Sequence, residues 1–254
     1  MTVDLDKNDV RAFYNRMWSH YDRGLSRHER ERFAAVIALV RGLERSNKAI
    51  LDAGCGLGKL SELLLPYGEV TATDWSDAGI EAARQRVSEA RFLTLDFVRD
   101  DIAPLIGQFG LVVSSEVVEH VGRGNRLTFV RNLAACLVPG GFLILTTPNK
   151  EVEEALPKAT QTSDDLSKPE SWHQPEDDLL TVEETLELVE RAGLRVLRCG
   201  SATFLEGPWE RSSKFRRLRS LLPRDRLGRD FIDRLLARTR FGVYTVVLAR
   251  RENE

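Results

Sequence analysis

The sequence predicts an α/β fold in which helices cover both faces of a Rossmann-like, seven-stranded and mostly parallel sheet. Short apolar runs rich in β-branched residues alternate with segments of helical periodicity along most of the chain. The runs are apolar throughout rather than at every second position, which is typical of parallel strands buried on both faces. A length of 254 residues, with 42% hydrophobic and 30% charged residues, suits one domain of this kind.

The expected elements follow one another along the chain. Strands are predicted at residues 49–54, 69–74, 91–96, 111–116, 141–148, 195–202 and 242–250, and the last of these can pair antiparallel at or near the edge of the sheet. Helices are predicted at residues 9–21, 29–43, 76–87 and 126–137. A further helix is expected after Thr181, with Glu184 as its capping-box partner and Gly193 as its end.

Charge is unevenly distributed, although the formal net charge is only −2. Residues 151–190 carry 13 acidic and 2 basic side chains, whereas residues 205–240 carry 11 basic and 5 acidic ones. The simplest interpretation of both segments is solvated surface. In the basic segment, arginines alternate with apolar residues such as Phe215 and Leu218. Residues 211–240 can therefore also form cationic helices on an anionic membrane surface, or a cap whose arginines pair with the acidic segment.

The cysteines and the apolar runs indicate the cellular compartment of the protein. Cys55, Cys136 and Cys199 form no CxxC pair, and a sparse, odd set fits a reducing compartment. No apolar run approaches the ~20 residues that span a bilayer, and the polar, acidic N-terminus does not resemble a signal peptide. We therefore expect a cytoplasmic protein, with peripheral contact to the inner face of a membrane as an addition.

The stretch "ILDAGCGLGKL" places Gly54, Gly56 and Gly58 between a strand and a helix. Glycines there allow a tight turn and let a ligand approach the backbone amides at the helix N-terminus. Lys59 stands where the third glycine of a dinucleotide-binding loop would be, so the pattern is GxGxG, preceded by Asp52. Taken alone, this loop is a weak signal.

Acidic residues also end the next two predicted strands. Asp74 lies 20 residues after Gly54, where a carboxylate can accept both hydroxyls of a ribose. Trp75 can cover an adenine face, and Asp96 with Phe97 can bind the adenine amino group and ring edge. An aspartate at a strand end is also an ordinary turn residue. Three of them in register, counting the one before the glycine loop, indicate a nucleoside site.

The motifs "LDAGCGLG", "TATDWS", "LTLDF", "FGLVVSSEVVEHV" and "LVPGGFLILTTPN" run in this order over residues 50–149. Together they resemble class I S-adenosylmethionine-dependent methyltransferases, nearest to the ubiquinone-pathway O-methyltransferases, which methylate catechol-like precursors. The resemblance implies a sheet with one antiparallel strand and S-adenosylmethionine as methyl donor. The donor-binding residues expected from the motifs and this resemblance are Arg32, Asp52, Gly54, Cys55, Gly56, Asp74, Trp75, Asp96, Phe97 and Ser115.

Several of these roles come from the resemblance alone. It implies that Gly54 and Gly56 approach the methionine part of the donor and that Ser115 lines the pocket of the transferred methyl group. It also implies an arginine on the donor's carboxylate, which is best matched by Arg32, with Arg27 and Arg30 as alternatives.

A polar cluster follows the fourth predicted strand. If residues 116–121 form a first helical turn, Glu116, Glu119 and His120 share one face. Two close carboxylates need a proton, an arginine or a divalent ion, and this oxygen and nitrogen set suits Mg²⁺, Mn²⁺ or Zn²⁺. The resemblance, which here extends to small-RNA 3′-end 2′-O-methyltransferases, implies His173 as a fourth ligand. A surface histidine in the acidic segment is the alternative.

Two mechanisms are therefore open. A metal held by Glu116, Glu119, His120 and His173 would bind the acceptor hydroxyl and lower its pKa. Without a metal, His120 takes the proton directly as the catalytic base, with Glu119 holding the imidazole.

The chain is interpreted as one domain of residues 1–254. Its expected parts are N-terminal helices that form a lid (1–46), a donor-binding half (47–150), an acidic active-site loop (151–180) and a C-terminal half (181–254) with a basic cap insertion (205–240). The aromatic residues Tyr14, Trp18 and Tyr21 are similar in kind to the lid helix of the ubiquinone-type enzymes.

The predicted function is methyl transfer to a hydroxyl of a small molecule, either phenolic and catechol-like or lipid-linked. One alternative is an RNA 3′-end 2′-O-methyltransferase, but the net charge of −2 and the lack of a separate RNA-binding module disfavour nucleic acid. The other is a non-catalytic donor-binding or scaffold protein, which the intact acids and the Glu/His set disfavour. The sequence predicts neither the acceptor nor the oligomeric state.

Overall fold

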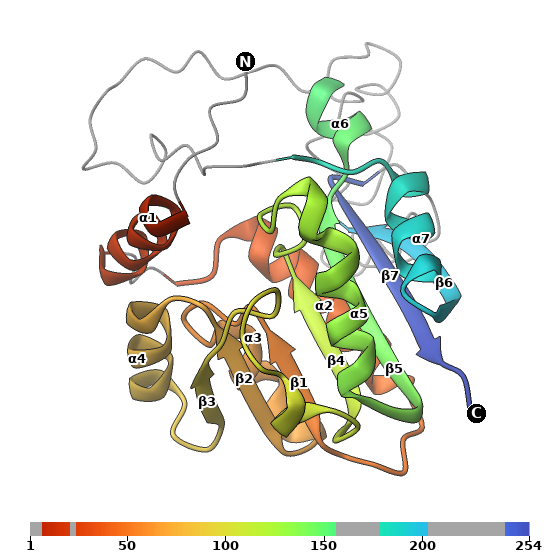
Figure 1. The fold of residues 1–254 in the computed structure, drawn as a ribbon, viewed down its shortest axis with the longest axis horizontal. Helices are drawn as coiled ribbons and strands as arrows, with labels where there is room; N and C mark the ends of the chain where they lie inside the picture. Colours follow the sequence, from red (N-terminus) through yellow and green to blue (C-terminus); the bar gives the residue numbers. More distant parts are fainter. Residues whose placement is uncertain (1–6, 21–23, 156–177, 203–241, 254) are drawn as a thin grey trace, which may run out of the picture.

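A central sheet of seven strands runs in the order β3-β2-β1-β4-β5-β7-β6 (Figure 1). The structure is a computed structural model that describes residues 7–20, 24–155, 178–202 and 242–253. The strands are β1 (Ile50–Ala53), β2 (Val70–Asp74), β3 (Arg91–Thr94), β4 (Phe109–Ser115), β5 (Leu137–Pro148), β6 (Leu194–Ala202) and β7 (Tyr244–Arg251). All seven predicted strands are present, so the predicted fold class is confirmed.

The strand directions also agree with the prediction. Strands β3, β2, β1, β4 and β5 pair in parallel, whereas β7 is antiparallel to both β5 and β6. The last strand of the chain therefore inserts between β5 and β6 rather than at the edge of the sheet. Because the parallel strands end on the same side, their carboxyl ends form one rim, where ligands bind in open α/β sheets.

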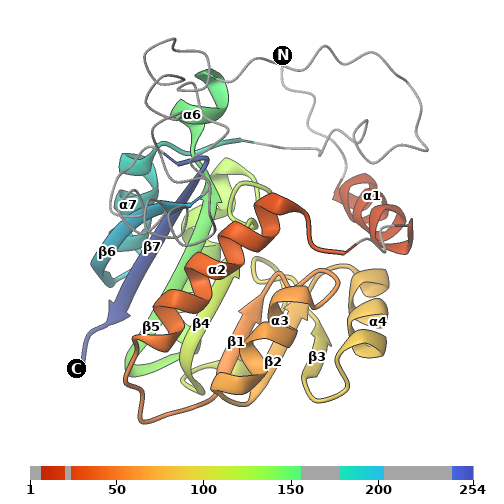
Figure 2. The same ribbon diagram turned by 180° about the vertical axis from the view of Figure 1, so that it is seen from behind.

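Helices cover both faces of the sheet. They are α1 (Lys7–His20), α2 (Arg27–Arg41), α3 (Lys59–Leu64), α4 (Asp77–Arg86), α5 (Arg126–Cys136), α6 (Lys150–Ala155) and α7 (Val182–Arg191), with short 3₁₀ turns at Leu65–Tyr67, Ala103–Leu105 and Arg123–Asn125. Figure 1 shows α5 and α7 on one face, and Figure 2 shows α2 and α3 on the other. This is the covered sheet that the continuously apolar strands predicted.

The packing explains why those strands are apolar throughout. Along β4, Val112 faces the cluster that contains Phe129 and Leu133 of α5. Its neighbours Leu111 and Val113 face the opposite cluster, which is lined by α2 and α3. Successive side chains of a strand point to opposite faces, so a strand that is covered on both sides needs apolar residues at every position.

Two helices begin with reciprocal caps. Ser26 caps α2 with Glu29 as its partner, and Thr181 caps α7 with Glu184. The second capping box is the predicted one. Gly193 follows the end of α7 with a φ of 87°, a left-handed conformation that favours glycine.

Helix α1 is tied to the amino end of α4, above the rim of the sheet. Arg11 forms an ion pair with Asp77 at 2.8 Å, and the Ser76 hydroxyl donates to Asn15 Oδ1 at 2.6 Å. Both ribbon views show α1 beside α4 at the end where the parallel strands finish (Figures 1 and 2). The helix therefore lies where the predicted lid was expected.

The segment after β4 differs from the prediction. Residues 116–121 do not form a helical turn: Glu116 has a φ of 59°, and the His120 amide donates to the Val117 carbonyl in a tight turn. In this turn the Val117 side chain packs beside Gly54, where an added Cβ would lie 2.2 Å from it. Helix α5 begins only at Arg126. Glu116 and Glu119 thus do not share a helix face.

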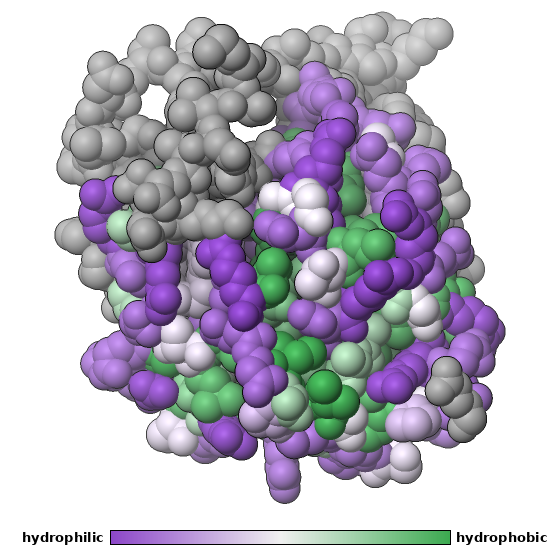
Figure 3. Space-filling model, in the orientation of Figure 1, coloured by the Kyte–Doolittle hydropathy of each residue, from purple (hydrophilic) through white to green (hydrophobic). Residues whose placement is uncertain are grey.

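Several sequence-based expectations lie outside the described residues. These are His173, Tyr21, residues 156–177 of the acidic loop and the whole of the basic insertion. Within the described part of the chain, no helix is long and apolar enough to cross a membrane. In the view of Figure 3, small apolar areas are interspersed with hydrophilic residues. The large hydrophobic side chains that are exposed in this part are Leu63, Ile106 and Leu197.

Candidate functional site

The glycine loop after β1 folds onto β2. Gly54, Gly56 and Gly58 all have positive φ values, of 85°, 50° and 73°, which residues with a side chain rarely adopt. The amides of Gly54 and Cys55 donate to the carbonyl of Thr73. The sequence had suggested bare amides facing a ligand. Instead, these amides hold the loop in place, and the missing side chains let Val117 and Trp18 pack closely against Gly54 and Gly56.

Asp74, at the end of β2, holds both the loop and its own turn. Its Oδ2 accepts from the Gly56 amide at 2.9 Å, and its Oδ1 accepts from the Ser76 amide at 2.8 Å. Burial raises the pKa of Asp74, while these amide bonds lower it. The carboxylate therefore lies between the loop and the rim, with further lone pairs for ribose hydroxyls.

Asp52 does not reach the rim. In the sheet register it lies opposite Ala72, two residues before the end of β2, so the three aspartates are not in register as predicted. Its side chain is 1% exposed and accepts a 2.6 Å hydrogen bond from Ser61 on α3. Burial raises its pKa from 3.8 to about 7. Asp52 is thus a buried acid beneath the loop rather than a direct ligand.

The third pair, Asp96 and Phe97, also differs from the expectation. Asp96 Oδ1 accepts from the Val98 amide at 2.8 Å, as an Asx turn does. The Phe97 side chain is buried and packs edge-on against Phe129, with ring centroids 6.1 Å apart. The ring therefore belongs to the core, and only Asp96 remains partly exposed at the end of β3.

Aromatic residues of α1 cover the loop. An added Cβ on Gly56 would lie 2.9 Å from the Trp18 ring, so this indole lies directly against the glycine loop. Tyr14 packs against Trp75 at 5.6 Å and against His120 at 5.9 Å between ring centroids. A single helix therefore contacts the glycine loop, the residue after Asp74 and the predicted catalytic histidine. That this helix acts as a lid stays a prediction.

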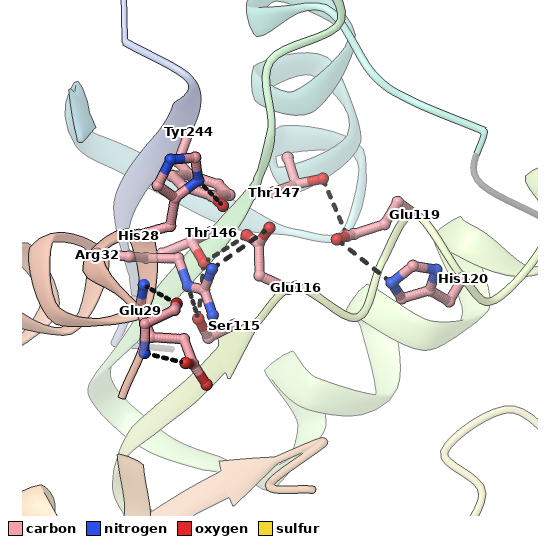
Figure 4. A network of polar contacts seen from close by, with 11 residues as sticks. His28, Glu29, Arg32, Ser115, Glu116, Glu119, His120, Thr146, Thr147 and Tyr244 are labelled. Atoms are coloured by element: carbon pink, nitrogen blue, oxygen red, sulfur yellow. Dashed lines mark hydrogen bonds and ion pairs between the residues drawn. The ribbon is translucent and has the colours of Figure 1, made fainter. Parts of the chain in front are cut away.

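Arg32 of α2 reaches the carboxyl end of β4 (Figure 4). Its Nε donates to Ser115 Oγ at 3.0 Å, and its Nη1 lies 3.7 Å from Glu116 Oε2. The alternatives that the sequence left open are engaged elsewhere: Arg27 pairs with Glu31, and Arg30 donates to the Leu25 carbonyl. Of the three arginines, Arg32 is the one that the structure brings to the site.

Glu116 is a buried acid beside this arginine. Its side chain is 17% exposed, and Oε1 accepts from Thr146 Oγ1 at 3.0 Å. Burial raises the pKa of Glu116 to about 8, and the negative charge of Glu119 adds to the rise, while Arg32 opposes it. The site therefore favours the protonated form of Glu116 more than water does.

Glu119 faces a different set of partners from Glu116. It is 1% exposed; its Oε2 accepts from Thr147 Oγ1 at 3.0 Å, and its Oε1 lies 3.6 Å from His120 Nε2 (Figure 4). A carboxylate at this place can orient the imidazole. The structure thus supports the predicted pairing of Glu119 with His120.

The described residues do not assemble the predicted metal site. Within them, no group of three or more His, Cys, Asp and Glu side chains lies close enough to hold an ion. Glu116 is turned towards the Arg32 guanidinium, whereas Glu119 is turned towards Thr147 and His120. A cation bound by both glutamates would compete with the arginine. This part of the donor set therefore does not fit a metal, and His173 lies outside the described residues.

Sequence reasoning did not single out three residues of this network. Thr146 and Thr147 supply the hydroxyls that bind the two glutamates, and Tyr244 stacks on Arg32. The two hydroxyls in the otherwise apolar run "LILTTP" were a usable signal, because a buried strand has no other need for them. Tyr244 lies near the start of a predicted strand, where an aromatic residue is common, so nothing in the sequence indicated its contact with Arg32.

The sequence profile of the methyltransferase domain family matches residues 20–198, which is more than half of the chain. The ubiquinone biosynthesis O-methyltransferase of Methylocella silvestris is 38% identical over 126 residues, covering 45% of this chain and 48% of that protein. The protein of the same name from Coxiella burnetii is 34% identical over 113 residues, covering 43% and 47%. The chain thus spans about half the length of the curated relatives it matches.

Solved structures show the same fold. The N-methyltransferase NodS of Bradyrhizobium japonicum, in complex with S-adenosylhomocysteine, superposes with a TM-score of 0.61. It is 16% identical, and the match covers 96% of this chain and 99% of that one. The fold predicted from the sequence is therefore the one that known methyltransferases have.

Proposed function

Because the chain belongs to the methyltransferase domain family, we propose that it transfers a methyl group from S-adenosylmethionine to a hydroxyl of a small-molecule acceptor. The acceptor in this proposal is phenolic and catechol-like, free or linked to a lipid. The name of the curated relatives supports a hydroxyl acceptor of the ubiquinone pathway for those proteins. One observation carries the proposal. Helix α1 packs both on Trp75, which follows the predicted ribose ligand Asp74, and on His120 of the Glu119–His120 pair.

The residues at the rim fit the chemistry of the donor. In the proposal, Asp74 accepts the ribose hydroxyls, Trp75 covers the adenine and Arg32 pairs with the carboxylate of the methionine part. The guanidinium is 11% exposed and ends beside Ser115, so its direction is fixed before a ligand arrives. When bound, S-adenosylmethionine supplies a methyl carbon that is activated by the adjacent sulfonium. The protein's task is to place the acceptor oxygen in line with it.

The acid–base part of the proposal rests on His120. The imidazole takes the proton of the acceptor hydroxyl as the oxygen attacks, and Glu119, 3.6 Å from Nε2, stabilises the imidazolium that forms. Thr147 holds the carboxylate on its other side. The positive charge near Glu116 is supplied by Arg32, so the cluster is neutralised by an arginine and a proton. The metal-assisted form of the proposal would require Glu116 to turn away from Arg32.

A transfer assay tests the function. The protein is incubated with methyl-labelled S-adenosylmethionine and a panel of catechols, and product methylation is followed by mass spectrometry. We expect transfer to a catechol oxygen, retained in excess EDTA and lost in His120→Gln. Full loss of turnover in EDTA with recovery on adding Mg²⁺ would support the metal-assisted mechanism. Label found only on an RNA 3′ end would replace the small-molecule acceptor, and no transfer to any acceptor would contradict the proposal.

A further inference from the structure

We propose that Tyr244 is a positioning residue for donor binding: its ring face fixes the Arg32 guanidinium in the direction that pairs with the donor's carboxylate. The proposal rests on the proposed function, because it concerns the same donor site. It adds a residue from the other end of the chain, at the first position of β7, to a site built from α2, β4 and the glycine loop.

The geometry places the guanidinium against an aromatic wall. The Arg32 Cζ lies 4.9 Å from the centroid of the Tyr244 ring and 5.2 Å from that of Phe33. Both distances lie within the range of attractive cation–π contacts. Ser115 and Glu116 bind the polar edge of the same group, at 3.0 Å and 3.7 Å. The arginine is therefore held on its face by rings and on its edge by oxygens.

Tyr244 itself is firmly held. It pairs in register with Pro148 of β5 and Ala202 of β6, and its side chain is 9% exposed. Its Oη lies 3.3 Å from His28 Nδ1, and the two rings meet nearly at a right angle (Figure 4). Burial raises the pKa of Tyr244 above its usual range, so the phenol stays neutral. A neutral ring on a strand that is paired on both sides is a rigid wall for a cation.

The Tyr244 ring is needed because the Glu116 carboxyl group and the donor's carboxylate would both bind the Arg32 guanidinium. An arginine side chain has several rotatable bonds, and a site in which it must be reoriented binds its ligand more weakly than a preorganised one. Without the ring, the guanidinium can turn fully onto Glu116, which is already within 3.7 Å. Removing the ring should therefore weaken the contact between Arg32 and the donor's carboxylate and leave the contacts to the nucleoside unchanged.

Two ligands separate this contact from the rest of the site. S-adenosylhomocysteine contains the carboxylate, whereas 5′-methylthioadenosine has the same nucleoside and sulfur without the amino-acid part. The binding of both is measured by calorimetry for wild type, Tyr244→Leu and Tyr244→Phe. We expect Tyr244→Leu to weaken S-adenosylhomocysteine about 5- to 30-fold, as expected from a partly desolvated cation–π contact. It should leave 5′-methylthioadenosine within about 2-fold, and Tyr244→Phe, which keeps the ring and loses the hydroxyl, should weaken S-adenosylhomocysteine less than Tyr244→Leu does.

A double-mutant cycle tests whether Tyr244 acts through Arg32. In an Arg32→Met background, Tyr244→Leu should cause no further loss of S-adenosylhomocysteine affinity. Equal weakening of both ligands, an additive loss in the cycle, or no loss at all would overturn the proposal. If Tyr244→Leu unfolds, as seen by circular dichroism, His28→Ala replaces it, and the same selective but smaller loss is expected. Wild-type protein that binds neither ligand would instead overturn the proposed function.

Discussion

Replacing the buried acid Asp52 by asparagine should change how the stability of the protein depends on pH. The side chain is 1% exposed, and burial raises its pKa from 3.8 to about 7. Between these two values the folded state holds a proton that the unfolded state has released, so folding stability falls as pH rises through this window. The asparagine side chain would keep an oxygen for the Ser61 hydroxyl but would not titrate.

The magnitude follows from the size of the shift. About three pKa units correspond to roughly 4 kcal/mol in full, of which about 2 kcal/mol develops between pH 5 and pH 7. Urea unfolding of wild type and D52N at a series of pH values gives the free energies. The free energy of unfolding of D52N, relative to that of wild type, should increase by about 2 kcal/mol between pH 5 and pH 7. Glu62→Gln, which removes an exposed carboxylate from the same helix as Ser61, serves as the control and should keep the wild-type pH dependence. Parallel curves for wild type and D52N would refute this reasoning.

Three further outcomes follow from the same geometry. Because ionised Glu116 competes for Arg32, S-adenosylhomocysteine affinity should fall as pH rises through about 8, and E116Q should abolish this fall; an unchanged pH profile in E116Q would contradict it. H120Q should lower the rate of methyl transfer by ~10²–10⁴-fold with donor affinity unchanged, and a weaker effect on rate would remove the catalytic role. G54A should destabilise the fold by roughly 2–4 kcal/mol, because the new Cβ meets Val117 at 2.2 Å and the φ is 85°. Adding V117A should recover the steric part alone, which thermal unfolding can measure.

The fold was predictable from the sequence because local signals and packing agree. Strands that are covered on both faces are apolar at every position, so each one stands out in the sequence as a continuous apolar run. All seven strands of the sheet were therefore predicted. The capping box at Thr181 was equally clear, since both partners lie within four residues of one another. The order of the strands in the sheet depends on how the chain crosses from one strand to the next, which local patterns do not encode. The prediction of one antiparallel strand came from the resemblance to a known family.

The site was less predictable, for reasons that are physical. The pattern Glu-x-x-Glu-His suggests a helical turn, but Glu116 has a left-handed conformation and Val117 packs closely against Gly54. Its carboxylate then meets Arg32, from a helix far earlier in the chain, a contact that no local pattern encodes. Likewise, the loop amides that looked available for a ligand are bonded to Thr73.

The central claim is that the rim of the sheet, from the glycine loop to Arg32, binds an adenosyl donor. It is tested most directly by a calorimetric titration of the wild-type protein with S-adenosylhomocysteine, repeated with Arg32→Met. We expect one molecule to bind per chain, with the affinity reduced at least about tenfold in Arg32→Met because a charge-assisted contact is lost. A folded wild-type protein that takes up no S-adenosylhomocysteine, or binding that is indifferent to Arg32, would contradict it.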